Sequence, residues 1–245
     1  MKAQRLSAVV ISFAVALSAT PVLGQLVQLS GGSSTDLQVR GTDNVVDFVP
    51  ATVSPLPSGD TLVASGPNAS ATATFAYSDT GFIISDLNYS LGAANQVSTF
   101  GQLAGQISFM PLADVIWELD GAYSWDGNWA NGVGLFARVT DTGTAAVITL
   151  HNYGSAGVLS NVSYTVGVGG GNVFNDVGPT SGVLLAGHQY LYEFGLSVDT
   201  NRFSPEVGTA TGNLALTFAA VPEPGVLALA GLGLPVLLAA WRRRR

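Results

Sequence analysis

The chain has 245 residues, of which 47% are hydrophobic and only 10% are charged. Residues 25–221 carry fifteen acidic residues against three basic ones, a net charge of −12. A segment this acidic cannot neutralise many phosphates. We therefore expect no nucleic-acid partner. The absence of cysteine excludes disulfides, thiol catalysis and cysteine-based metal sites.

Residues 1–24 have the layout of a secretory signal peptide. Two basic residues near the start precede an apolar run at residues 8–17 and a more polar stretch that ends in a small residue. The apolar run is shorter than the roughly 20 residues that a membrane-spanning helix needs. We therefore expect signal peptidase to cut after Gly24, with cleavage after Ala19 as the alternative.

Residues 25–220 are typical of one all-β domain. Short stretches of alternating apolar and polar residues are separated by Gly, Asn, Asp and Ser. The clearest stretch is 189–198, where every second residue is aromatic or aliphatic. No long stretch has helical periodicity, and about ten strands predict an antiparallel two-sheet sandwich, jelly-roll-like, with a barrel as the alternative. The other expected strands are residues 71–77, 82–91, 106–110, 133–139, 146–150, 162–168 and 214–218.

Residues 114–131 hold the densest cluster of acidic and aromatic side chains. Trp117, Trp125 and Trp129 are three of the four tryptophans of the chain. Flat aromatic rings beside carboxylates could form a platform that stacks on sugars and accepts their hydroxyl hydrogen bonds. The alternative, which we favour, is that these tryptophans lie in the core on strands joined by an acidic turn.

The same segment offers carboxylates for other chemistry. A glycosidase needs two acids about 5–10 Å apart with pKa values driven in opposite directions, but fifteen acids supply many pairs by chance. The segment does not fit the EF-hand pattern for calcium, and His151 and His188 lack the spacing of a helical zinc site. We therefore expect no catalytic residue, no metal and no cofactor. The carboxylates considered are Asp114, Glu118, Asp120 and Asp126.

Residues 221–245 form a segment of three parts. A Val-Pro-Glu-Pro motif at 221–224 is followed by an uncharged apolar run at 225–241 and by an arginine cluster at 242–245. The apolar run is at the short end for a membrane span. The positive-inside rule places the arginines in the cytoplasm, so we expect a single C-terminal transmembrane helix with the β domain outside.

The two prolines of the motif fix φ and stop a helix from propagating out of the membrane. The residue before each proline is pushed toward extended geometry. The motif therefore presents an extended strip just outside the bilayer, with Glu223 as its single charge.

The order of motif, apolar run and arginine cluster closely resembles the PEP-CTERM sorting signal. The resemblance implies that an exosortase, a membrane-embedded enzyme, processes the tail, and that the protein reaches the surface or the extracellular polymeric material of a Gram-negative bacterium. Gly225 departs from the family pattern, in which Ser or Thr often follows the motif. The residues carried over are Pro222, Glu223, Pro224, Arg242, Arg243, Arg244 and Arg245.

Taken together, the sequence predicts an exported, non-enzymatic protein with a structural or interaction role. Its partners would be signal peptidase and exosortase, with the inner membrane as a transient anchor before release to the cell surface or extracellular matrix. One alternative is a carbohydrate-binding module for matrix polysaccharide. A secreted glycoside-active enzyme is the other, disfavoured, alternative.

Overall fold

Strands make up every regular element that the structure describes. This part of the chain contains no helix, and so no helical segment able to cross a bilayer. The predicted signal peptide at 1–24 and the predicted apolar span at 225–241 lie outside it. The computed structural model describes residues 25–30, 33–41, 46–52, 60–92, 98–168, 173–200 and 207–222.

These residues form a wholly β domain, which confirms the predicted class. The alternation predicted for 189–198 is also present, because β12 buries every second residue from Tyr190 to Thr200. The strands are β1 (Val27–Leu29), β2 (Ser34–Arg40), β3 (Val46–Thr52), β4 (Asp60–Gly66), β5 (Ala69–Ser78), β6 (Gly81–Gly92), β7 (Phe100–Pro111), β8 (Val115–Asp141), β9 (Ala146–Thr165), β10 (Val173–Val177), β11 (Ser181–Leu184), β12 (Tyr190–Thr200) and β13 (Val207–Ala220).

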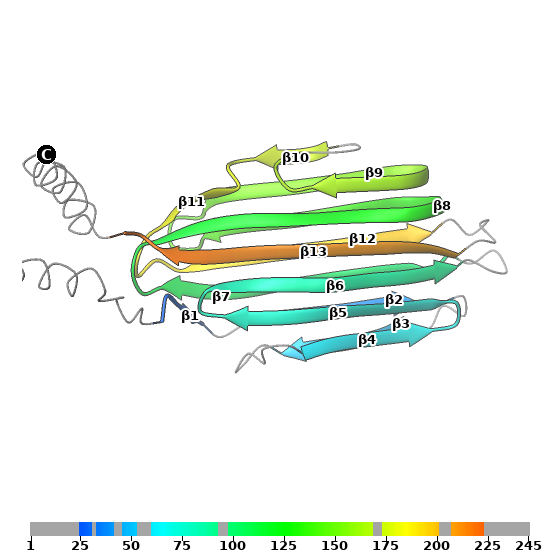
Figure 1. The fold of residues 1–245 in the computed structure, drawn as a ribbon, viewed down its shortest axis with the longest axis horizontal. Coiled ribbons are helices and arrows are strands. Elements are labelled where there is room, and N and C mark those ends of the chain that lie inside the picture. The colour runs from blue at the N-terminus through cyan, green and yellow to red at the C-terminus, as the bar shows by residue number, and fades with distance from the viewer. Residues whose placement is uncertain are drawn as a thin grey trace, which may run out of the picture.

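All of these strands belong to one antiparallel sheet whose main path runs β3-β2-β7-β12-β8-β13-β6-β5-β4. The sheet forms two layers, with β13, β6 and β5 in front of β12, β7 and β2 in Figure 1. The all-β class is confirmed, but the single sheet folds over until its end strands β3 and β4 nearly close it, which is nearer to the barrel alternative than to a jelly-roll-like sandwich. The prediction of two separate sheets is wrong, because β8 continues from one layer into the other.

The strand β8 joins the layers by doubling back in its middle. Its first half, to Asp126, pairs with β13, and its second half, from Ala130, pairs with β12. Gly127 between the halves has φ 154°, a conformation that favours glycine. The pairing of β8 with β9 shifts register several times between Trp125 and Gly132, as expected for bulges that bend a strand.

Aromatic side chains fill the space between the layers. The ring of Phe82 on β6 stacks on Tyr192 of β12, with 6.5 Å between centroids, and meets Phe109 of β7 edge to face at 5.3 Å. The hydroxyl of Tyr89 on β6 donates to the carbonyl of Leu196 on β12 at 3.1 Å. Ring packing and hydrogen bonds thus fix the distance between the layers.

The two ends of the strand path lie next to each other. The amide of Ser65 on β4 donates to Oδ2 of Asp47 on β3 at 2.7 Å. Farther in, Thr35 of β2 and the hydroxyl of Tyr77 on β5 are hydrogen bonded at 2.8 Å. The folded sheet is therefore held together at its open side as well as through β8.

Glycines on neighbouring strands make room for the large aromatic residues of β8. Trp117 lies over Gly182 of β11, and Trp125 lies over Gly208 of β13. A Cβ atom on Gly208 would overlap the six-membered ring of Trp125. Gly208 is therefore required by the close packing of a ring against the backbone of the adjacent strand, whereas a Cβ atom on Gly182 would lie 3.0 Å from Nε1 of Trp117, a tighter contact than usual.

We expect Gly208→Ala to lower the free energy of unfolding by about 1–3 kcal/mol, because the added methyl group forces Trp125 out of its site. Gly132→Ala is the matched control, since the nearest atom to its added Cβ is the Ser155 carbonyl oxygen at 3.5 Å, an ordinary contact. Thermal unfolding of both purified variants measures the difference. Equal melting temperatures for the two variants would refute this packing argument.

Candidate functional site

The C-terminal tail leaves the domain from β13, a strand that is paired on both edges. β13 lies between β6 and β8, and its last pair on β8 joins Ala220 to Val115. The amide of Val221 then donates to the carbonyl oxygen of Asp114 at 3.3 Å. Pro222 has no N–H to continue the ladder, so pairing ends where the motif begins. Val221 and Pro222 are both exposed.

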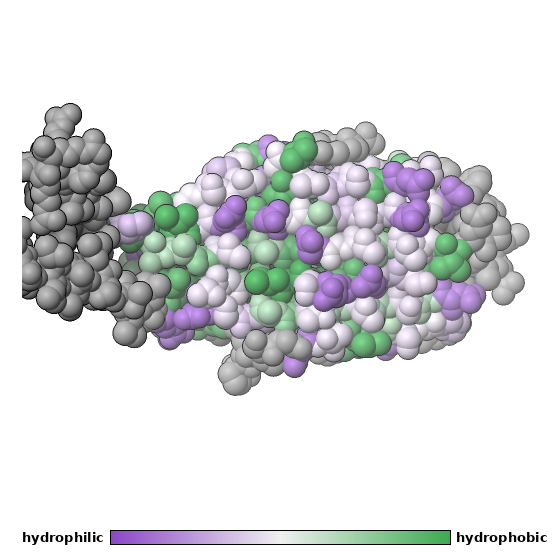
Figure 2. All heavy atoms as spheres, in the orientation of Figure 1, coloured by the Kyte–Doolittle hydropathy of each residue, from purple (hydrophilic) through white to green (hydrophobic). Residues whose placement is uncertain are grey.

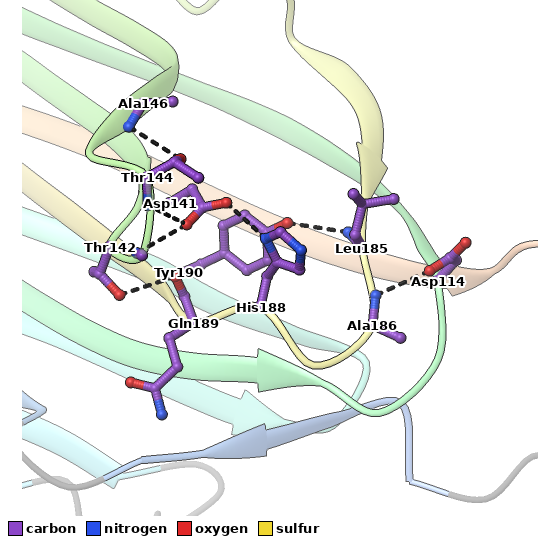
Figure 3. Close-up of polar contacts among 11 residues, drawn as sticks. Asp114, Asp141, Thr142, Thr144, Ala146, Leu185, Ala186, His188, Gln189 and Tyr190 are labelled. Carbon is purple, nitrogen blue, oxygen red and sulfur yellow. Dashed lines mark hydrogen bonds and ion pairs between the residues drawn. The ribbon is translucent and has the colours of Figure 1, made fainter.

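Hydrogen bonds hold a turn of the chain against this exit (Figure 3). Oδ1 of Asp114 accepts the amide of Ala186 at 2.9 Å. The amide of Leu185 donates to the hydroxyl of Tyr190 at 3.0 Å. The loop between β11 and β12 is therefore fixed beside the point where the tail starts.

The side chains of His188 and Asp141 form a contact that holds the other side of the same loop. Nδ1 of His188 lies 2.8 Å from Oδ2 of Asp141, and Oδ1 of Asp141 accepts the amides of Gly143 and Thr144 at 2.9 and 3.2 Å. The His188 hydrogen bond, helped by the two amides, holds the pKa of Asp141 below its ordinary value. This arrangement fastens two turns together, as Figure 3 shows.

The second histidine, His151, lies between a carboxylate and a hydroxyl, as the histidine of a catalytic triad does, but it is buried. Nδ1 of His151 is 2.6 Å from Oδ1 of Asp176, and Nε2 is 3.0 Å from Oγ1 of Thr149. Thr149 and His151 are each only 1% exposed, and Oγ1 of Thr149 donates to the carbonyl of Pro179 at 2.7 Å. Because no substrate reaches this hydroxyl, the cluster supports the packing of β9 against β10. In the described part of the chain, no three His, Asp or Glu residues are grouped to hold a metal.

The predicted sugar platform does not fit the observed burial of its tryptophans. Trp117 and Trp125 are 1% and 2% exposed, so neither indole face can stack on a sugar, and both belong to the core as the favoured alternative stated. Trp129 lies on β8, but its side chain is outside the described part.

The acidic residues of the segment lie on the opposite side of the strand. Along residues 115–126 of β8, odd-numbered positions are buried and even-numbered ones face outward. Glu118, Asp120 and Asp126 are therefore exposed, on the face away from Trp117 and Trp125. These acids therefore cannot form one site with Trp117 and Trp125.

A different feature is hollowed into the outer face of the layer that contains β12. It is a shallow depression of about 510 Å³ on β2, β7, β12, β8 and β9. Gly195 lies at its centre, directly between Ala104 and Phe136 on the neighbouring strands. Because Gly195 and its β7 neighbour Ala104 are both small, the floor of the depression is low there. The row that crosses the depression is Asp36, Ala104, Gly195, Phe136 and Asn152.

The next row of the same face is charged. Arg138 donates from Nε to Oε2 of Glu193 at 2.7 Å, and its guanidinium carbon lies 5.8 Å from the centre of the Phe136 ring. This pairing orients the arginine beside the aromatic ring. We name the depression and this row the outer groove. The sequence interpretation missed it because its members come from five strands whose register the sequence does not reveal.

Comparison with known proteins identifies the tail. The family model of the PEP-CTERM protein-sorting motif matches residues 220–245. The chain carries a PEP-CTERM sorting motif. The match starts at the last residue of β13, so the motif begins where the folded domain ends.

The PEP-CTERM motif supports an exported protein that is sorted by way of an exosortase. Of the predicted signal residues, Pro222 is described and lies at the tail exit. Glu223, Pro224 and Arg242–Arg245 are within the matched range but outside the described residues.

Other comparisons add little to the PEP-CTERM match. No curated protein matches the chain. A structure of infectious bursal disease virus, Gx strain, is 12% identical, with 85% of this chain and 70% of that chain covered and a TM-score of 0.19. The VP2 subviral particle of the same virus is 11% identical, with 89% and 72% covered and a TM-score of 0.19.

The Asp141–His188 contact predicts a pH-dependent stability. Since the folded pKa of Asp141 is lowered, its contribution is present above the unfolded pKa of about 3.9 and is lost as the pH falls through the folded pKa. Asp141→Asn should therefore lower the melting temperature at pH 7 and lose this deficit on strong acidification. Asp79→Asn, in the exposed turn between β5 and β6, is the charge-matched control. A deficit that persists unchanged at low pH would contradict the assignment.

Proposed function

We propose that this chain is an exported surface or matrix protein with a structural or interaction role, delivered by its tail. Signal peptidase removes residues 1–24, and residues 225–241 then hold the chain in the inner membrane with the arginines on the cytoplasmic side. Exosortase processes the tail near the motif at 221–224, and the domain passes to the cell surface or extracellular matrix. The observation that carries the proposal is the sorting motif matched at residues 220–245, directly after β13.

The fold supports processing at this position. The last strand of the described domain ends at Ala220. The backbone hydrogen bond described beyond that residue joins Val221 to Asp114. Removal of the residues that follow would leave the core between the layers untouched. The domain can therefore remain folded after it leaves the membrane.

A non-catalytic role fits the chemistry of the described surface. The buried His151 cluster has no access to substrate, and the exposed acids of β8 lie along an open strand face. Neither arrangement favours the glycoside-active enzyme.

The proposal predicts that the motif controls release from the membrane. A Pro222→Ala, Pro224→Ala double variant should remain in the membrane fraction, because the extended recognition strip is lost. Pro235→Ala, within the apolar run, is the control and should be released like the wild type. Immunoblots of membrane and extracellular fractions from the native host measure the distribution. Equal release of the double variant and the wild type would overturn the proposed role of the motif.

Carbohydrate binding is a second candidate, and the outer groove favours it. A half-buried aromatic ring beside carboxylate, amide and guanidinium groups is a combination that stacks on sugars and hydrogen bonds their hydroxyls. The row from Asp36 to Asn152 crosses five strands, a distance of about 19 Å at the usual strand spacing. The groove is therefore long enough for a short stretch of a polysaccharide chain.

Truncation of the aromatic ring tests this candidate. Phe136→Ala should weaken binding to a retained polysaccharide about tenfold, equivalent to about 1.4 kcal/mol. Ile83→Ala removes an exposed apolar side chain on β6, in the other layer of the domain, and should bind like the wild type. Affinity electrophoresis across a panel of glycans measures the retardation. If no glycan retards the wild type, or if both variants bind equally, the groove is not a carbohydrate site.

A further inference from the structure

Large apolar side chains are exposed around the point where the tail leaves the domain. They come from three separate segments: the turn between β7 and β8 with the start of β8, the strand β11 with the loop after it, and the residue after β13. Their exposed fractions lie between 37% and 54%. We name them the exit patch: Leu112, Ile116, Val183, Leu185 and Val221.

The strand register brings these residues together. Ile116 is paired with Val183 on one side and with Ala219 on the other, and all three face outward. Val221 continues β13 and is bonded to Asp114, in the turn that also contains Leu112. Figure 2 shows apolar surface gathered at this end of the domain, the left end in the view.

The patch is held in place by the bonds that fix the loop after β11. The amide of Leu185 is bonded to Tyr190, and Ala186 is bonded to Asp114, as Figure 3 shows. Leu185 therefore stays beside the tail exit without support from another molecule. An apolar surface that is rigid and exposed is typical of an interaction site.

The length of the motif determines what this surface can meet. Four residues, 221–224, separate β13 from the apolar run that starts at residue 225. Fully extended, they span at most about 14 Å. The headgroup region on one side of a bilayer is itself about 5–8 Å thick. The tail exit therefore cannot lie far above the lipid surface while the tail is inserted.

We propose that the exit patch rests on the lipid surface of the membrane before the tail is processed. This inference rests on the proposed function, because it requires residues 225–241 to be inserted. The tether gives the patch a high local concentration at the bilayer, so that weak apolar contact is enough. Contact lets the exposed side chains leave water and orients the motif at the membrane surface, where a membrane-embedded enzyme acts.

The charges near the patch specify the kind of contact. Asp114 and Glu118 are exposed beside it. Of the two described arginines, Arg40 lies on β2, and Arg138 lies on the second half of β8, where it is paired with Glu193. An acidic border cannot attract an anionic surface. The contact is therefore apolar, and anionic lipids should not strengthen it.

Single-cysteine labelling tests the contact, because the chain has no cysteine of its own. The full chain carrying Val183→Cys, labelled with an environment-sensitive fluorophore, is reconstituted into phosphatidylcholine vesicles that contain spin-labelled lipid. The matched control is Val207→Cys, an exposed valine at the opposite end of β13. Val207 lies thirteen positions before Ala220, which is about 43 Å along an extended strand.

We expect quenching at position 183 to exceed quenching at position 207 by about twofold or more, with a blue-shifted emission. Replacement of a third of the lipid by phosphatidylglycerol should leave the difference equal or smaller. Equal quenching at both positions in vesicles where the tail resists carbonate extraction would overturn the inference and leave the proposed anchoring intact. Quenching that requires anionic lipid, or that appears only when an exosortase is added, would also overturn it. A chain that carbonate extracts would instead contradict the anchoring step of the proposed function, and the inference with it.

Discussion

The continuity of β8 is the constraint on which the rest of this domain depends. One strand pairs with β13 through its first half and with β12 through its second half, so both layers take their register from it. Gly127 and the neighbouring bulges allow it to double back. The buried Trp125 on its inner face then requires Gly208 on the adjacent strand, because a ring of that size leaves no room for a Cβ atom.

This arrangement places the C-terminal strand inside the sheet rather than at its edge. β13 is bonded to β6 on one side and to β8 on the other, so force or motion in the tail meets two ladders of hydrogen bonds. The domain ends at Ala220 and the sorting motif follows at once. The folded domain and the sorting motif are thus joined with almost no linker. Insertion of residues 225–241 in the membrane, as we propose, would keep the tail exit and its apolar surroundings close to the lipid surface.

Local patterns in the sequence predicted parts of β5 to β9, β12 and β13, and the tail, but not β1 to β4, β10, β11 or the path of the sheet. The alternation at 189–198 reappears as β12, and the motif at Pro222 begins where β13 ends. The fold-over of β8 was not predictable, because it depends on pairing with β12 and β13, roughly 50–105 residues away in sequence. Trp117 and Glu118 are neighbours in a strand, so their side chains face opposite sides of the sheet. The sequence alone could have predicted this, and would then have placed the tryptophans and the acids on different faces. The outer groove needed the register of five strands, which no single stretch of sequence contains.

The central claim is that processing near the sorting motif separates the folded domain from its C-terminal tail. The mass of the intact protein, measured separately in membrane and extracellular fractions of the native host, tests it most directly. The account predicts an extracellular form that starts near Gln25 and ends near the motif at 221–224. A chain that still ends at Arg245 and is found solely in the membrane fraction would contradict it, and would make the tail a permanent anchor.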